Sequence, residues 1–115
     1  MHKIEDLIIW KKSIELTKAI YIIASEIHPD ERYGLISQIK RSSVSIASNI
    51  VEGAGRNSNK EFKQFLSISN GSCFELQTQL ILLQELKLIN KEKIKPVTDI
   101  CIEIQKMNYS FQKTL

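Results

Sequence analysis

The chain has 115 residues, of which 43% are hydrophobic and 25% charged, and its formal net charge is +3. This composition excludes a disordered chain and is typical of one globular domain spanning residues 1–115. The chain contains only four glycines and two prolines. An all-β fold needs more turn residues, so the composition favours long helices.

The first predicted helix covers residues 4–27. Glu5 and Asp6 are expected in its first turn, where carboxylates face the positive end of the helix dipole. Pro29 ends the helix because the residue before a proline avoids the helical conformation. The apolar residues of the predicted buried face recur mainly at steps of three and four: they are Leu7, Trp10, Ile14, Leu16, Ile20, Ile23 and Ile27.

The second predicted helix covers residues 31–52, and we expect Gly53 and Gly55 to end it in the left-handed conformation that glycine readily adopts. Its polar residues recur at steps of four, four and three, which places them on one face: they are Arg41, Ser45, Asn49 and Glu52. This face is interpreted either as a polar groove that binds a ligand or partner, or as a close helix crossing whose polar groups pair with each other.

The third predicted helix begins after Ser58, a good N-cap with Glu61 three residues later, and ends between Leu86 and Asn90. Its apolar and small residues alternate at steps of four and three, as in a helix bundle: they are Phe62, Leu66, Ser69, Cys73, Leu76, Leu80 and Leu83. Small residues gather around Gly71, which predicts that another helix approaches closely there.

The fourth predicted helix follows Asn90. Proline is tolerated only near a first turn, so Pro96 predicts that the regular helix begins around Lys95. Short links make successive helices antiparallel. The fold class is therefore all-α, an antiparallel up-down-up-down four-helix bundle.

Several apolar residues lie off these buried faces, and they predict a second apolar surface that copies of the chain bury against one another. The alternative is a wide apolar stripe inside a single bundle. The residues are Ile8, Ile9, Ile22, Ile81, Leu82 and Ile102.

Residues for catalysis, metal binding or cofactor binding are not recognisable in the sequence. Cys73 and Cys101 are expected as buried free thiols, and His2 and His28 have no partner at helical spacing. An enzyme, for example a phosphodiesterase using Arg41, Asn49 and Glu52, is the least favoured hypothesis because no base, acid or metal partner accompanies them. No signal segment or membrane span is recognised, so we expect a cytoplasmic protein without membrane association.

Basic residues gather in or beside the connection between the second and third helices, and they are candidate contacts to RNA or DNA phosphates. They are Lys40, Arg41, Arg56, Lys60 and Lys63. A second cluster comprises Lys87, Lys91, Lys93 and Lys95. In a monomer these clusters would be weak, whereas a ring of copies would join them into a continuous positive surface.

The sequence resembles the proteins encoded in intervening sequences of bacterial 23S ribosomal RNA genes. The resemblance covers nearly the whole chain. The matching residues are Asp6-Leu7 with Trp10-Lys11; Glu31-Arg32-Tyr33-Gly34-Leu35 with Ser37-Gln38-Ile39 and Arg41; Ser45 with Ser48-Asn49-Ile50 and Glu52-Gly53; and Phe65-Leu66-Ser67-Ile68 with Gly71-Ser72 and Glu75-Leu76.

The resemblance implies an antiparallel four-helix bundle that assembles into a homopentamer. The chain is also similar to the accessory variability protein of diversity-generating retroelements, a basic pentamer that binds nucleic acid and a reverse transcriptase. It departs from the family pattern at Ala47, where proline is frequent, and at Val51, where alanine is usual. We therefore expect a non-enzymatic oligomeric scaffold that contacts nucleic acid. The alternative is a protein–protein interaction module with no nucleic-acid role.

Overall fold

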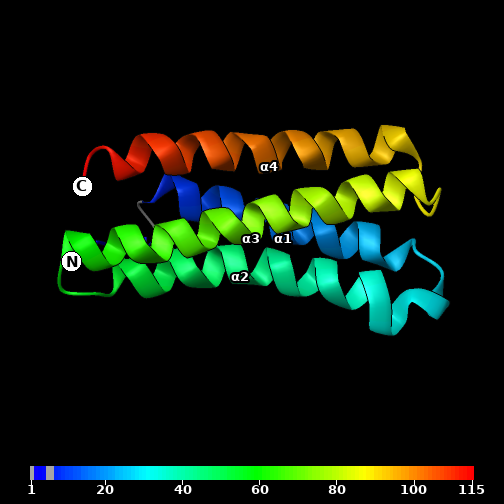
Figure 1. Cartoon of the computed structure of the whole chain (residues 1–115), viewed down its shortest axis with the longest axis horizontal. Coiled ribbons are helices and arrows are strands. Elements are labelled where there is room, and N and C mark those ends of the chain that lie inside the picture. Colours follow the sequence, from blue (N-terminus) through cyan, green and yellow to red (C-terminus); the bar gives the residue numbers. More distant parts are fainter. Residues whose placement is uncertain (1, 5–6) are drawn as a thin grey trace.

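The computed structural model describes residues 2–4 and 7–115, and this part of the chain forms four α-helices with no strand. They are α1 (Ile8–Ser25), α2 (Ser37–Ala54), α3 (Asn59–Glu85) and α4 (Lys91–Gln112). The helices lie lengthwise in a bundle measuring 43 × 23 × 21 Å (Figure 1). Each helix packs against the next in the chain and α4 returns to α1, so the predicted all-α four-helix bundle is confirmed.

The bundle core is built from the apolar faces that the helical periodicity predicted. The residues predicted to be buried on α3, from Phe62 to Leu83, are all buried. Each fully buried leucine or phenylalanine contributes about 1.5–3 kcal/mol relative to leaving it exposed. On α1 the buried face passes through Ser13, whose hydroxyl donates to the Trp10 carbonyl at 2.6 Å. Ile14, predicted to be buried, is exposed because it lies on the neighbouring face of the helix.

The segment before α2 differs from the prediction of a continuous helix from residue 31. Pro29–Glu31 forms a 3-10 turn and Arg32–Ile36 a single π-type turn, with Gly34 in a non-helical conformation (φ −107°, ψ −116°). The α-helix therefore begins at Ser37, six residues later than predicted. α1 likewise begins at Ile8, and the expected positions of Glu5 and Asp6 in its first turn lie outside the described residues.

Gly53 and Gly55 do not adopt the left-handed conformation predicted for them. α2 continues through Gly53 to Ala54, and Gly55 caps it with a right-handed φ of −83°. Gly53 is instead needed for packing, because a Cβ atom there would lie 2.8 Å from Cδ1 of Phe62 and 2.8 Å from Cβ of Phe65. Two helices therefore also approach closely at Gly53. Gly71 itself is exposed, with nothing within 4 Å of a Cβ at its position, but the predicted close approach lies beside it, where Ser69 and Ser72 contact α2.

α3 begins as predicted, since the Ser58 hydroxyl accepts a hydrogen bond from the Glu61 backbone at 3.2 Å. α4 begins at Lys91, four residues earlier than predicted. Ile94 is buried and draws this first turn onto the core. Pro96 is tolerated within the helix because it is exposed and lies near the N-terminus. Proline has no N–H, so the only backbone hydrogen bond missing is the one to the Glu92 carbonyl.

Candidate functional site

A line of paired polar groups, which we call the polar seam, joins α2 to α3. The Ser45 and Ser72 hydroxyls lie 2.8 Å apart, and the Ser42 hydroxyl donates to the Glu75 carboxylate at 3.0 Å. The Ser69 hydroxyl donates to the Ile46 carbonyl at 2.9 Å. Buried hydroxyl groups need such partners, because an unpaired one costs about 1–3 kcal/mol. The seam thus lets two serine-rich helix faces pack closely.

Of the four residues predicted on one polar face, the structure places two in this seam. The Asn49 amide donates to the Ser45 carbonyl at 2.8 Å and to its hydroxyl at 3.1 Å. Glu52 lies outside the seam, where its carboxylate is 3.3 Å from the Arg56 guanidinium. Arg41 is exposed beside the seam and lines a polar hollow of about 200 Å³ with Gln38, Ser42, Glu75 and Gln79.

The five predicted phosphate contacts are divided between two places on the bundle. Lys40 and Arg41 lie in the second turn of α2, whereas Arg56 follows its last turn. The helix between Arg41 and Ala54 separates them by about 20 Å along the bundle axis. Lys40 packs over the Tyr21 ring, with its Nζ 4.9 Å from the ring centroid. The five residues therefore do not form one continuous patch.

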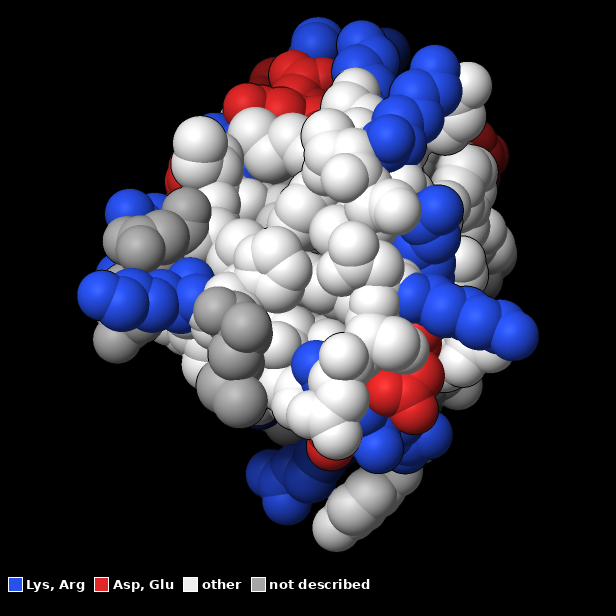
Figure 2. All heavy atoms as spheres, turned by 90° about the vertical axis from the view of Figure 1, so that its left-hand side faces the viewer, with Lys and Arg blue, Asp and Glu red and all other residues white. Residues whose placement is uncertain are grey.

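Arg56, Lys60 and Lys63 are exposed at the end of the bundle where α2 meets α3. α4 ends at the same place and adds Lys113, since Lys63 and Lys113 line one groove. Figure 2 views this end and shows Lys and Arg side chains around most of its rim, with fewer Asp and Glu between them. We call these four residues the basic end. The contribution of Lys113 was not predicted, because it lies 50 residues after Lys63 in the sequence.

The second predicted basic cluster lies at the opposite end and is partly neutralised. Lys93 Nζ is 3.2 Å from the Glu26 carboxylate, and Lys95 Nζ is 3.1 Å from the Asp99 carboxylate. Lys87 and Lys91 are exposed at the same connection. Within the described part of the chain, two of these four lysines are paired, whereas at the basic end only Arg56 is paired, with Glu52, so this end offers a weaker field to an anionic partner.

The predicted second apolar surface is largely exposed. Ile8 and Ile22 are 68% and 64% exposed, and Ile81 and Leu82 are also exposed. Ile9 is buried and Ile102 half-buried, so these two belong to the bundle itself. The exposed residues of this set lie on α1 and α3, where their apolar area is available for contact with another protein.

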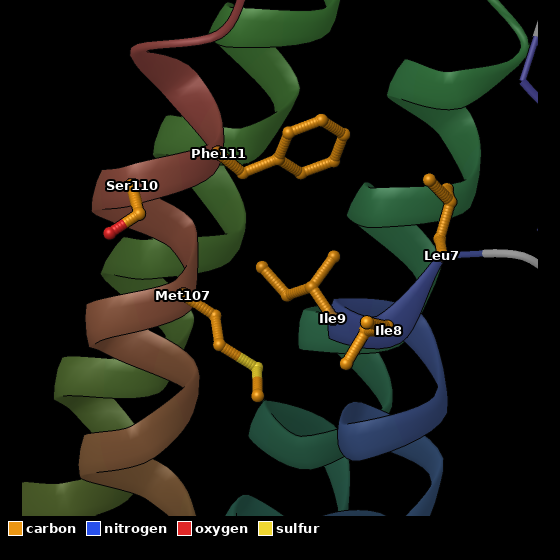
Figure 3. A pocket seen from close by; sticks show the side chains of 6 residues that line it. All are labelled: Leu7, Ile8, Ile9, Met107, Ser110 and Phe111. Atoms are coloured by element: carbon orange, nitrogen blue, oxygen red, sulfur yellow. The ribbon is translucent and has the colours of Figure 1, made fainter.

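Two apolar hollows adjoin α1. One, of about 380 Å³, lies between the start of α1 and the end of α4 (Figure 3). Ile9 and Met107 point into it from the two helices, whereas Ser110 points away. The other, of about 320 Å³, lies between α1 and α2 and is lined by Trp10, Ile14, Thr17, Val44, Ala47, Ser48 and Val51. Both positions that depart from the family pattern therefore line this second hollow.

Within residues 2–4 and 7–115, no group of three or more His, Cys, Asp or Glu side chains could hold a metal ion. In the same part of the chain, none of the helices combines the length and the apolar character that crossing a membrane requires. Cys73 and Cys101 are buried as predicted, with their Sγ atoms 3.2 Å apart. The hydrogen bond with Cys73, together with burial, raises the pKa of the Cys101 thiol far above its ordinary value.

The fold and these surfaces define an antiparallel helical bundle with a polar seam, a basic end and exposed apolar faces. Comparison with known families is consistent with this description: the family model of the 23S rRNA-intervening sequence protein matches residues 5–110. The chain belongs to this family.

A solved structure has the same fold. It is the 1.70 Å crystal structure of a protein of unknown function from the S23 ribosomal protein family of Bacteroides thetaiotaomicron. The two chains superpose with a TM-score of 0.84 and share 27% sequence identity, over 92% of this chain and 99% of the other. No curated protein matches the chain.

Proposed function

We propose that this protein is a non-enzymatic oligomeric scaffold whose basic surface contacts RNA or DNA phosphates. The observation that carries the proposal is the basic end, where Arg56, Lys60, Lys63 and Lys113 are exposed on one end of the bundle. Such groups neutralise phosphates without reading the base sequence. Lys40 and Arg41 provide a second, separate contact about 20 Å away along the axis.

Self-association would strengthen this surface. The resemblance to the family implies a homopentamer, and exposed Ile8, Ile22, Ile81 and Leu82 offer apolar area for contacts between copies. A ring of copies repeats the basic end and raises the local potential above that of one chain with a net charge of +3. We place the protein in the cytoplasm, where buried free thiols such as Cys73 and Cys101 stay reduced.

The absence of an enzymatic role is supported by the positions of the three residues considered for catalysis. Asn49 is bound to Ser45, and Glu52 is paired with Arg56. Arg41 lies beside a different part of α3, with Glu75 and Gln79. The three side chains therefore do not converge on one reacting atom, as a catalytic set must.

The test is a binding titration of a labelled RNA and a labelled DNA duplex against salt concentration. If the basic end neutralises phosphates, the logarithm of the binding constant should fall linearly with the logarithm of the salt concentration. On duplex DNA the slope is about −0.9 for each phosphate neutralised. Replacing Arg56, Lys60 and Lys63 together by Glu should abolish binding. The matched control replaces Lys91, Lys93 and Lys95 by Glu, which changes the net charge equally at the opposite end.

Equal losses in both variants would show that only net charge matters, and would contradict a role for the basic end. A flat slope, or no binding at low salt, would discard the nucleic-acid function. The alternative would then stand, a protein–protein interaction module using the exposed apolar faces. Light scattering that gives only 13.2 kDa particles would overturn the oligomeric part of the proposal.

A further inference from the structure

A polar groove of about 330 Å³ lies between α3 and α4 at the basic end, within the size range of small-ligand sites. It is lined by Lys63, Asn70, Asn108, Tyr109, Gln112 and Lys113. Two of these residues are lysines and one is an aromatic residue. Tyr109 lies on the last helix, 46 residues after Lys63, so the sequence does not place it beside the basic cluster.

Tyr109 is an exposed aromatic platform beside the two lysines. Its side chain is 67% exposed, although an aromatic ring of this size normally contributes area to a core or an interface. Lys113 Nζ lies 4.3 Å from the ring centroid and covers part of the ring. With so much of the ring exposed, Tyr109 retains apolar surface on which a second planar group can stack.

Amide side chains line the floor of the groove, and hydrogen bonds hold two of them, Asn108 and Gln112, in position. The buried Asn108 donates from Nδ2 to the Leu66 carbonyl at 2.8 Å, and its Oδ1 accepts from Gln112 Nε2 at 2.6 Å. Asn70 Oδ1 is buried there and has no hydrogen-bond partner among the described residues. Gln112 is half-buried and uses only one Nε2 hydrogen in its bond to Asn108, so its amide can still exchange hydrogen bonds with the edge of a nucleobase.

This combination matches the parts of one nucleotide. A phosphate carries the charge that two ammonium groups attract, a base has a planar face, and its edge exchanges hydrogen bonds. Bases inside a duplex are already stacked on both faces, so Tyr109 can stack only on an unpaired base. We propose that this groove binds an unpaired nucleotide of single-stranded nucleic acid, with Tyr109 stacking on the base and Lys63 and Lys113 contacting phosphate.

This inference rests on the proposed function and adds a preference for single strands. The experiment measures binding of the full-length protein to a labelled single-stranded RNA and to a labelled duplex by fluorescence anisotropy, at one salt concentration. Base stacking on an aromatic side chain contributes about 1–3 kcal/mol, so Tyr109→Ala should weaken single-strand binding by about 5- to 150-fold. Duplex affinity should remain unchanged, and Tyr109→Phe should retain single-strand affinity.

The matched control is Tyr33→Ala, which removes another exposed tyrosine far from the groove. Circular dichroism and light scattering on each variant check that the fold and the oligomer mass are unchanged. Single-strand binding that survives Tyr109→Ala, but is lost when Arg56, Lys60 and Lys63 become Glu, would overturn this inference and leave the proposed function intact. If Tyr109→Ala changes the oligomer mass, the residue contacts another copy and the inference is also overturned. No binding of the unmodified protein to either probe would overturn both.

Discussion

Gly53 in the last turn of α2 packs directly against Phe62 in the first turn of α3. This contact leaves no room for a side chain, because a Cβ on Gly53 would lie 2.8 Å from Phe62 Cδ1. Phe62 is buried and the second close atom, Phe65 Cβ, is next to the backbone, so α3 itself would have to shift. Overpacking costs about 1–3 kcal/mol, which exceeds the gain of up to about 1 kcal/mol in helix propensity. We expect Gly53→Ala to lower the free energy of unfolding by about 1–2 kcal/mol in urea denaturation.

Gly71→Ala is the matched substitution, and we expect the opposite sign. Gly71 lies in the middle of α3, is exposed, and has nothing within 4 Å of a Cβ at its position. Alanine should therefore raise the free energy of unfolding by about 0.5–1 kcal/mol, since it restricts the unfolded chain and favours the helix. Urea denaturation at one protein concentration measures both variants. A loss of stability at Gly71 that depends on protein concentration would instead indicate a contact between copies there.

The two glycines show how far the sequence could predict the fold. The repeat from Phe62 to Leu83 on α3 predicted burial correctly, because helical spacing alone decides which residues share a face. The identity of the tight glycine could not be predicted, because it depends on which side chain of the next helix lies opposite. The separation of Lys40 and Arg41 from Arg56, by contrast, follows from the helical rise along α2 and was within reach of the sequence.

The candidate groove was less accessible to sequence reasoning than the fold. Lys63 was recognised as part of a basic cluster, but Tyr109 lies on α4 and Lys113 directly after it, more than 40 residues later. They meet Lys63 only because α4 ends where α3 begins. An exposed aromatic residue beside a lysine on the last helix was the available signal, and it is weak without knowledge of the opposite helix.

Lys87 adopts a left-handed conformation, with φ of 58°, directly after the C-cap of α3. The Leu88 backbone donates to the Leu83 carbonyl at 2.9 Å and the Lys87 backbone to the Gln84 carbonyl at 3.0 Å, which is the Schellman arrangement that usually has glycine at this position. A residue with a Cβ is strained there by about 1–2 kcal/mol. We expect Lys87→Gly to raise the free energy of unfolding by about 0.5–1 kcal/mol, after the entropy of glycine in the unfolded chain is counted.

The control is Lys87→Ala, which removes the same charge but keeps a Cβ atom. Because alanine does not relieve the left-handed strain, its thermal midpoint should stay near that of the unmodified protein. If both variants gain the same stability, the loss of the lysine charge is responsible and not the relief of the backbone conformation.

The Cys73 and Cys101 thiols are protected by burial between α3 and α4. Each donates to the backbone carbonyl of the other at 3.3 Å, and their Sγ atoms lie 3.2 Å apart. We expect reaction with Ellman's reagent at pH 8 to be at least about 100-fold slower in the folded protein than in urea, since reagent reaches these thiols only after local or global opening. Fast labelling of both thiols in the folded state would show that this part of the core opens readily.

The same pair gives a pH dependence of stability. The hydrogen bond with Cys73 and burial raise the pKa of the Cys101 thiol, so the folded state keeps this proton when the unfolded chain loses it. The stabilisation is complete below the unfolded pKa of about 8.5 and is lost as the pH rises above it, because unfolding then releases a proton. We expect the free energy of unfolding to fall by up to about 1.4 kcal/mol per pH unit above pH 8.5 for this group.

Urea denaturation between pH 7 and 10 measures this slope. The control is Cys101→Ser, which keeps a small hydrogen-bonding group but does not ionise, and it should flatten the slope. An equal slope in the variant would assign the alkaline loss of stability to other groups.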